Sequence, residues 1–406
     1  MDKSRKHLRR SFESWALPLR PENLWIMSKT LRIKKGVDIR LTGTPSTACA
    51  DAPQPLVVAV QPTDCPGLIP KLVVKEGASV QAGDALFHDK TCPTVMFASP
   101  VSGTVKEVVR GAKRRILAVV VEADGANQSH DFGPWKGGGR EALLAHLSAS
   151  GAFAFFRQRP FDVLANPSDT PRAIYVSGFD SSPLAADPAV VVDGRLEDLQ
   201  QGIDALAILA GDGGVHLGIR PDQKALSSLN GCNTTSFSGP HPAGNVGVQI
   251  HHTAPINKGE VIWTLGLQEV ISMGTLLRSG HYDATRVVAA GGSEMTNPRH
   301  LRTKAGAQLS GLGLDVKEGA RLISGSVLTG TNAGPQGYLG ATASQIVALP
   351  EGHDPKFMLT EGWLSPGINK FSASRAYPTW LMPKSKAYTL DTVSYTHLTL
   401  PTILLV

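Results

Sequence analysis

The stretch at residues 193–211, DGRLEDLQQGIDALAILAG, is the clearest helix signal in this chain of 406 residues. Its large apolar side chains recur every three or four residues, which places them along one face of a helix. These side chains are Leu196, Leu199, Ile203, Leu206 and Leu209. Asp193 stands before the periodic run, where its carboxylate can accept hydrogen bonds from the free amides of a first turn. The pattern therefore predicts one amphipathic helix with Asp193 as its N-cap.

Apolar runs typical of buried strands lie on both sides of this helix. Residues 171–180, PRAIYVSGFD, precede it, and residues 214–220, GVHLGIR, follow it. A strand, a helix and a second strand in this order indicate a parallel α/β unit. The glycines at 211, 213 and 214 come after the helix and before a strand, the reverse of the order in a dinucleotide-binding fingerprint. We therefore interpret them as a turn and predict no phosphate-binding loop.

A second pattern occupies residues 71–90, KLVVKEGASVQAGDALFHDK. Its Glu-Gly and Gly-Asp pairs mark tight turns between short strands, and Val80, Leu86 and Phe87 are expected to form a small core. Residues 97–125, FASPVSGTVKEVVRGAKRRILAVVVEADG, open a second, similar half. Two half-motifs in this order resemble the barrel-sandwich fold of lipoyl and biotinyl carrier domains. The sequence therefore predicts a small β domain ahead of the α/β unit.

Carrier domains of that type present a modified lysine at a hairpin tip, and Lys90 occupies a similar place after Asp89. Residues 91–94, TCPT, follow it, where a carrier hairpin needs a tight and regular turn that its ligase can recognise. Two interpretations of Lys90 stay open, a modified carrier lysine and a solvated loop lysine. The turn sequence favours the solvated lysine.

The composition argues against several classes of protein. The net charge of +6 is not gathered into a Lys/Arg run with interleaved aromatic residues, so nucleic-acid binding is not expected. No stretch reaches the roughly 18 apolar residues that a transmembrane helix needs. The four cysteines, Cys49, Cys65, Cys92 and Cys232, form no CxxC pair. We expect reduced thiols rather than a disulfide framework, a zinc site or an iron–sulfur cluster.

Three of the twelve histidines lie in residues 239–260, GPHPAGNVGVQIHHTAPINKGE, whose glycines and prolines predict a loop. His251 and His252 are adjacent, and on an extended segment they would point to opposite faces, so one metal ion could not readily take both. His241 stands between two prolines, and no HExxH pattern is present. No metal site and no catalytic residue are predicted. A structural hydrogen-bonding role and contact with an organic ligand stay open for these imidazoles.

Several longer stretches together resemble one family. They are MSKTLRIKKGVDIRLTG at 27–43, SGAFAFFRQRPFD at 150–162, TPRAIYVSGFDSSPLAADP at 170–188, SGPHPAGNVGVQIHHTAPINKGEVIWTLGLQEVISMG at 238–274 and VVAAGGSEMTNPRHLRTKAGA at 287–307. In this order, over residues 27–390, the chain resembles the NqrA family, which supplies one subunit of the Na+-translocating NADH:quinone reductase, a bacterial respiratory complex.

The resemblance implies a function in that complex, which oxidises NADH, reduces ubiquinone to ubiquinol and exports Na+. It implies five other subunits as partners, which carry the flavins, the iron–sulfur centre and the membrane helices. This subunit would be a peripheral part on the cytoplasmic face of the bacterial inner membrane. It would be linked to ubiquinone binding, with no covalently bound cofactor and little or no activity alone. His241 and His251 are the first candidates for quinone contacts, because a quinone carbonyl needs a hydrogen-bond donor.

The resemblance also implies a multidomain fold with α/β and β parts. We expect a barrel-sandwich (lipoyl-like) domain at 27–135, a Rossmann-like α/β domain at 136–262 with an interdomain loop at 239–260, a β-grasp domain of the soluble-ligand-binding type at 263–345, and a short C-terminal region at 346–392. Residues 1–26 would be an extension outside the family pattern. Residues 393–406, VSYTHLTLPTILLV, would be a non-native tail that cuts the C-terminal region short.

Overall fold

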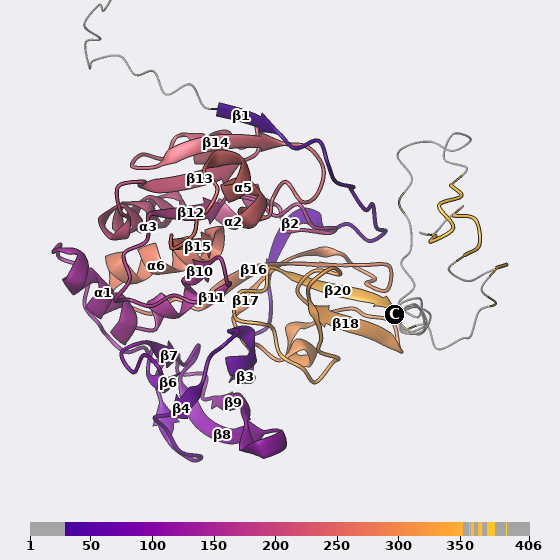
Figure 1. Ribbon diagram of the computed structural model, residues 1–406. Coiled ribbons are helices and arrows are strands. Elements are labelled where there is room, and N and C mark those ends of the chain that lie inside the picture. Colours follow the sequence, from indigo (N-terminus) through magenta and orange to yellow (C-terminus); the bar gives the residue numbers. More distant parts are fainter. Residues whose placement is uncertain are drawn as a thin grey trace, which may run out of the picture.

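The computed structural model describes residues 29–351, and beyond them 357, 359–360, 364–367, 372–377 and 387. Three units are visible in Figure 1: an α/β unit at the top, a β unit at the lower left and a second β unit at the lower right. The expected extension at 1–26 and the expected tail at 393–406 lie outside the described residues.

The α/β domain is built on a seven-stranded sheet with the order β1-β14-β13-β12-β15-β10-β11. Its strands are β1 (Lys29–Arg32), β10 (Arg157–Arg159), β11 (Val163–Leu164), β12 (Ala173–Ser177), β13 (Val215–Ile219), β14 (Asn233–Ser238) and β15 (Ile262–Gly266). The first five strands in the order are parallel to one another. β10 pairs antiparallel with β15, and β11 pairs antiparallel with β10. The parallel pairing of β12 with β13 confirms the predicted strand–helix–strand unit.

Helices cover both faces of this sheet. Alternate side chains of a strand point to opposite faces, so each face carries side chains that pack against helices. They are α1 (Arg140–Ala149), α2 (Pro188–Val192), α3 (Leu196–Leu209), α4 (Lys224–Ser227), α5 (Val246–Thr253) and α6 (Leu267–Ser279). On one face, Ile174 and Val176 of β12 pack into the same apolar cluster as buried residues of α1, α3 and α6. On the other face, Tyr175 of β12 packs with Ile250 of α5.

The predicted helix at 193–211 is α3, with four of its five predicted core side chains fully buried. Leu196, the fifth, is exposed at the first helical position. The predicted N-cap is wrong: Arg195 holds that position, and Asp193 ends α2. The reason is that α2 occupies the residues directly before, so the chain turns through Gly194, at φ 68°, before α3 begins.

The barrel-sandwich domain has two antiparallel sheets, β3-β9-β8-β5 and β4-β6-β7. Its strands are β3 (Val57–Val60), β4 (Pro70–Leu72), β5 (Ser79–Val80), β6 (Ala85–Asp89), β7 (Met96–Ala98), β8 (Gly103–Arg110) and β9 (Ile116–Ala123). Val80, Leu86 and Phe87 are buried, as predicted. Phe87 stacks on Phe97 with their ring centres 4.8 Å apart.

The β-grasp domain holds a mixed six-stranded sheet with the order β19-β18-β20-β16-β17-β2. Its strands are β2 (Ser46–Asp51), β16 (Thr285–Gly291), β17 (Arg299–Lys304), β18 (Ala320–Ser324), β19 (Thr331–Asn332) and β20 (Gln345–Pro350). The predicted boundary at 345 is wrong, because β20 lies inside this sheet. Ile346, Val347 and Ala348 are fully buried there and complete the core rather than begin a C-terminal region.

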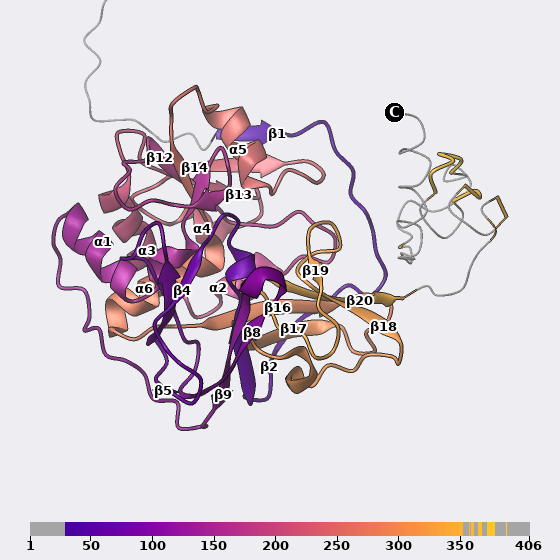
Figure 2. The same ribbon diagram turned by 60° about the horizontal axis from the view of Figure 1, so that its bottom comes forward.

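The predicted range of the barrel-sandwich domain, 27–135, is also wrong at its start, because it includes two strands that belong to other sheets. β1 pairs with β14 in the α/β sheet, and β2 pairs with β17 in the β-grasp sheet. Figure 2 shows β1 and β2 at separate ends of the molecule. The alternating pattern predicts a strand but not its partner, because pairing with a distant strand leaves no local signal. The barrel-sandwich strands begin with β3.

The prediction that residues 239–260 form an interdomain loop is also wrong. This segment contains α5, and β15 returns after it to the α/β sheet beside β12. α6 follows directly and packs on α3, so the α/β domain continues to Ser279 and not to 262. The glycines and prolines concealed a short helix whose apolar side chain, Ile250, is buried against Tyr175.

A buried ion pair joins the α/β domain to the β-grasp domain. Arg286 of β16 lies 2.6 Å from Glu269 in the first turn of α6, and the two side chains are only 2% and 7% exposed. Arg286 also donates a hydrogen bond of 2.6 Å to the carbonyl of Ala341. Next to Glu269, the Gln268 amide exchanges two hydrogen bonds of 2.8 Å with the backbone of Val287. These contacts fix β16 against the first turn of α6.

A carboxylate marks the place where all three domains meet. Asp64 ends the 3-10 helix η1 (Pro62–Asp64) of the barrel-sandwich domain. Its carboxylate accepts a hydrogen bond of 2.8 Å from the amide of Ala341 in the β-grasp domain, and its carbonyl accepts one of 3.3 Å from Arg157 in the α/β domain. Burial raises the pKa of Asp64, although the Ala341 amide and the Arg157 charge act in the opposite direction.

Removing one partner of the interdomain ion pair is expected to destabilise the fold strongly. Glu269→Gln leaves the buried Arg286 charge unpaired, which costs about 3–5 kcal/mol. The double variant Glu269→Leu with Arg286→Met removes both charges and should recover most of that loss. Urea unfolding followed by circular dichroism measures both effects.

The exposed pair of Lys106 and Glu122, with side chains 51% and 58% exposed, supplies the control. Glu122→Gln should change the free energy of unfolding by less than about 1 kcal/mol. Equal stability of Glu269→Gln and wild type would contradict the role given to the ion pair.

The raised pKa of Asp64 predicts a pH-dependent difference between wild type and Asp64→Asn. The stabilisation that protonation of Asp64 gives is fully present below its unfolded-state pKa and is lost as the pH rises through the higher folded-state pKa. The stability of wild type relative to Asp64→Asn should therefore increase as the pH falls from 7 towards 4. Other carboxylates are common to both proteins and cancel in the difference. A constant or reversed difference in the urea midpoints would refute this prediction.

Candidate functional site

A cavity of about 490 Å³ lies at the carboxyl ends of β12 and β15. The chain runs from β12 to β13 and β14 on one side and then returns to β15 on the other side of β12. The order of strands therefore reverses between β12 and β15. Open α/β sheets bind ligands outside the strand ends at such a reversal. The cavity lies where a fold of this class accepts a ligand.

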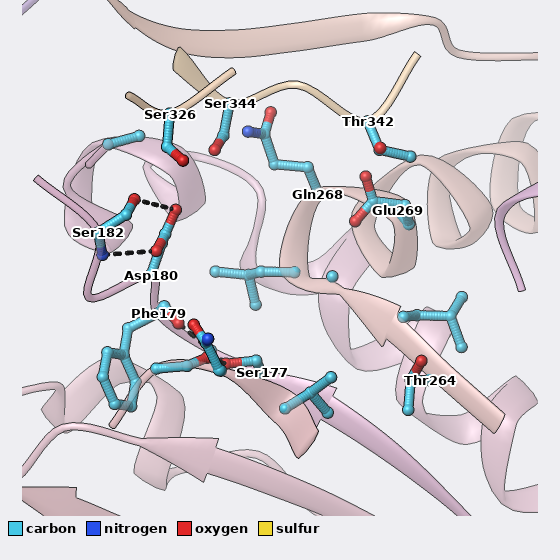
Figure 3. Close-up of a pocket in the computed structure, with 18 of the residues that line it drawn as sticks. Ser177, Phe179, Asp180, Ser182, Thr264, Gln268, Glu269, Ser326, Thr342 and Ser344 are labelled. Carbon is cyan, nitrogen blue, oxygen red and sulfur yellow. Dashed lines mark hydrogen bonds between the residues drawn. The ribbon is translucent and has the colours of Figure 1, made fainter. Parts of the chain in front are cut away.

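The α/β and β-grasp domains together form the walls of this cavity. Figure 3 shows Ser326, Thr342 and Ser344 of the β-grasp domain on the side opposite Ser177 and Thr264. The further polar side chains in the walls are Arg157, Arg159, Asp162, Asp180, Ser182, His241, Asn245, Gln268, Glu269, Arg286 and Thr329. The apolar ones are Phe155, Phe179, Ala186, Pro188, Val191, Val246, Leu265, Leu267 and Leu328. The cavity is thus amphipathic.

The loop after β12 is held in place from both domains. The Asp180 carboxylate accepts hydrogen bonds of 2.8 Å from the amide and from the hydroxyl of Ser182 (Figure 3). It also accepts one of 3.0 Å from the amide of Gln345, which is fully buried in β20. The shape of this wall therefore depends on the docking of the β-grasp domain.

The amino-terminal turn of α6 forms another part of the wall, and a carboxylate covers it. A Cβ atom at Gly266, the N-cap of α6, would lie 2.1 Å from Oε2 of Glu269. The Glu269 carboxylate therefore folds back over the helix terminus, where an anionic ligand would otherwise bind. A side chain at 266 would have to displace this carboxylate. The charge at this end of the cavity disfavours a phosphate group.

The cations in the wall have partners within the protein. Arg159 lies 3.4 Å from Asp162, and Arg286 pairs with Glu269. Arg157 donates to the carbonyl of Asp64. The wall therefore presents balanced charge rather than a positive surface.

His241, one of the two predicted quinone contacts, lies in the cavity wall. Ser181 Oγ lies 3.0 Å from its Nδ1 atom and accepts a hydrogen bond of 2.8 Å from the amide of Gly244. In the tautomer in which the Ser181 hydroxyl donates to Nδ1, the Nε2 atom carries a proton. The backbone amide of His241 donates to Asp38 at 3.0 Å. The loop thus fixes the ring, and in that tautomer Nε2 can donate a hydrogen bond to a ligand.

His251 and His252 lie in the last turn of α5, so the extended conformation predicted for them is wrong. Both are exposed, and neither lines the cavity that holds His241. The Nδ1 atom of His252 lies 2.9 Å from the Val248 carbonyl. The structure therefore separates His251 from His241, which the sequence had grouped as quinone contacts.

Lys90 follows β6 directly, and its side chain is exposed. Residues 90–95 connect β6 to β7, a longer link than a tight hairpin. The Asp89 carboxylate accepts hydrogen bonds from the amides of Ile69, at 3.4 Å, and Thr91, at 3.2 Å. This irregular link favours the solvated loop lysine over a carrier lysine.

Other sequence signals have a plain structural place. Gly211 and Gly213 pack on the backbone of Pro171 and Arg172, at the amino ends of the parallel strands and away from the cavity. The predicted turn is thus confirmed.

In the described part of the chain, no group of three or more His, Cys, Asp or Glu side chains has an arrangement that could hold a metal ion. None of the described helices has the length and apolar character that a membrane crossing requires.

Sequence reasoning missed the residues that shape the cavity. Glu269 and Gln268 follow a buried strand at the start of a helix, and this position is a signal that could have indicated a site. Arg286 stands in the otherwise apolar run TRVVAAG, where a lone arginine has to find a buried partner. Asp180 ends the strand segment 171–180 and carried no recognisable motif.

Three family models match the chain in order along its length. They are the NqrA N-terminal barrel-sandwich hybrid domain at residues 31–124, the NqrA second alpha/beta domain at 139–282 and the NQRA C-terminal domain at 287–334. The third match begins at β16, where the β-grasp strands that follow α6 begin. The matched ranges follow the three units of the fold, except that the first includes β2 and the third ends before β20, both of which lie in the β-grasp sheet.

Full-length relatives give the same assignment. The NqrA subunit of the Na(+)-translocating NADH-quinone reductase of Serratia proteamaculans (strain 568) is 37% identical, over 90% of this chain and 82% of that protein. The protein of the same name from Rhodopirellula baltica is 36% identical, over 87% of this chain and 79% of its own length. The one from Alcanivorax borkumensis is 37% identical, over 87% and 80%. The chain therefore belongs to the NqrA family, whose members are subunits of the Na(+)-translocating NADH-quinone reductase, an oxidoreductase complex.

Proposed function

We propose that this chain binds ubiquinone in the cavity between β12, β15 and the β-grasp domain. It would do so as a peripheral subunit on the cytoplasmic face of the bacterial inner membrane. The complex would oxidise NADH, reduce the quinone to ubiquinol and export Na+. The observation that carries this proposal is an amphipathic cavity of about 490 Å³ at the strand reversal, with an imidazole donor in its wall.

A quinone head group matches the chemistry of these walls. Its ring is flat, uncharged and apolar on both faces, and its two carbonyl oxygens only accept hydrogen bonds. Phe179, Leu265 and Leu267 supply apolar surface, and His241 Nε2 supplies a donor. Volumes of this size are typical of small-molecule sites with a few placed polar groups.

The other redox groups are assigned to the five partner subunits. The glycines at 211–214 lie at the wrong end of the strands to hold a pyrophosphate, and Glu269 covers the helix terminus that a flavin phosphate would use. The cysteine spacing does not suit an iron–sulfur cluster. The subunit would therefore bind quinone without flavin, cluster or covalent cofactor, and would have little or no turnover alone.

Replacing the imidazole donor tests the proposal. His241→Ala should weaken binding of decylubiquinone to the purified chain about tenfold, because one hydrogen bond to the carbonyl is lost. His241→Gln keeps a donor and should recover part of the affinity. Equilibrium dialysis measures the dissociation constants.

His251→Ala is the matched control, since that ring is exposed on α5 and does not line the cavity. Its affinity should equal that of wild type. The proposal fails if wild type shows no saturable binding. The assignment of His241 alone fails if His241→Ala binds as wild type does.

A further inference from the structure

Two large apolar side chains stand in water next to the cavity. Phe161 is 78% exposed and Leu328 is 44% exposed. Leu328 lines the cavity, and Phe161 stands between Arg159 and Asp162, which also line it. They come from different domains, Phe161 from the α/β domain and Leu328 from the β-grasp domain.

Phe161 is held at the rim by a short, braced turn. It lies between β10 and β11, and its neighbours Arg159 and Asp162 both line the cavity. Arg159 and Asp162 form an ion pair of 3.4 Å across the turn. Asp162 has a φ of 55°, a left-handed conformation that fixes the direction of the chain. The ring is therefore positioned in solvent at the edge of the cavity.

Leu328 occupies the loop between β18 and β19 of the β-grasp domain and itself lines the cavity. Ser326 closes this loop: its hydroxyl lies 3.1 Å from that of Thr329, and its carbonyl accepts a hydrogen bond of 2.7 Å from Gly330. Leu328 is thus carried at the tip of a closed loop, partly in the cavity and partly in water.

We infer that Phe161 and Leu328 form the exit for the apolar polyisoprenoid tail of the quinone. This inference rests on the function proposed above. A quinone with its head group in the cavity has to lead its tail out past the rim, where Arg159, Asp162, His241 and Asn245 are polar. The two apolar side chains provide the surface on which the first tail units lose contact with water.

A small apolar chain fits this surface better than a partner protein does. A stable protein interface buries about 800 Å² on each side, with a continuous apolar centre. Two side chains on separate loops are much smaller than that. Leu328 belongs to the cavity wall, and Phe161 is flanked by Arg159 and Asp162 of that wall.

The test compares a ligand with a tail and a ligand without one. Wild type should bind decylubiquinone at least about tenfold more tightly than the tail-less dimethoxy-methyl-benzoquinone, because the tail buries apolar surface on Phe161 and Leu328. The single variant Phe161→Ser changes a side chain outside the cavity lining, so it should keep the affinity for the tail-less ligand and lose part of the gain from the tail. The double variant Phe161→Ser, Leu328→Ser should lose most of that gain, measured as the ratio of the two affinities. Phe161→Leu, with Leu328 intact, should keep the gain.

A matched control replaces two similarly exposed apolar side chains far from the cavity. Ile69 and Val73 flank β4 of the barrel-sandwich domain and are 51% and 54% exposed. Ile69→Ser, Val73→Ser should leave both affinities unchanged. This control accounts for any general effect of surface polarity on a hydrophobic ligand.

Each outcome is decisive. A tail-dependent gain that persists in the Phe161, Leu328 variant overturns the exit and leaves the proposed function intact. The exit is also overturned, with the proposed function intact, if that variant keeps the tail-dependent gain and loses only its association with the other subunits. The rim would then be a protein-docking surface. Absence of binding of both ligands to wild type overturns the proposed function and the exit together.

Discussion

The ion pair between Arg286 and Glu269 is the contact on which the cavity depends. Burying either charge alone costs several kcal/mol, so β16 cannot slide along α6 without exposing or isolating a charge. The Ala341 carbonyl and the ring of Phe155, 5.5 Å from the guanidinium carbon, surround the remainder of Arg286. The β-grasp loop that contains Ala341 is thereby held over the carboxyl ends of β12 and β15. The two walls of the cavity keep a fixed separation although they belong to different domains.

The same pair sets the charge at one end of the cavity. In open α/β folds, the helix that starts at the strand reversal offers the positive end of its dipole to a phosphate. Here Arg286 requires a carboxylate at that place, and Glu269 supplies it by folding over Gly266. The protein's own charge therefore occupies the usual anion position. A fold typical of nucleotide binding is left with a cavity better suited to an uncharged ring.

The parts that could be predicted from the sequence are those whose signal is local. The apolar period of α3, the strands on either side of it and the small core around Phe87 all follow from residues close together in the chain. The parts that could not are those that depend on distant partners. β1 and β2 each join a sheet formed by residues far along the chain, and α5 is too short for its period to stand out among glycines and prolines. His241, predicted as a quinone contact, lies in the cavity lining, but nothing local in the sequence connects it with Glu269 or Arg286.

The segment between β1 and β2 shows why the site is a property of the domain arrangement rather than of a motif. It crosses from the α/β sheet to the β-grasp sheet and passes the histidine of the cavity on its way. The amide of Val37 donates to the carbonyl of His241, and Asp38, 203 residues earlier in the chain, accepts from its amide. At Gly36 the approach is so close that a Cβ atom would lie 2.0 Å from that carbonyl oxygen. Deletion of either β1 or β2 would therefore loosen the segment that holds His241 and would also remove a strand from the sheet of one domain. The donor, the cavity and the junction between the domains depend on one another.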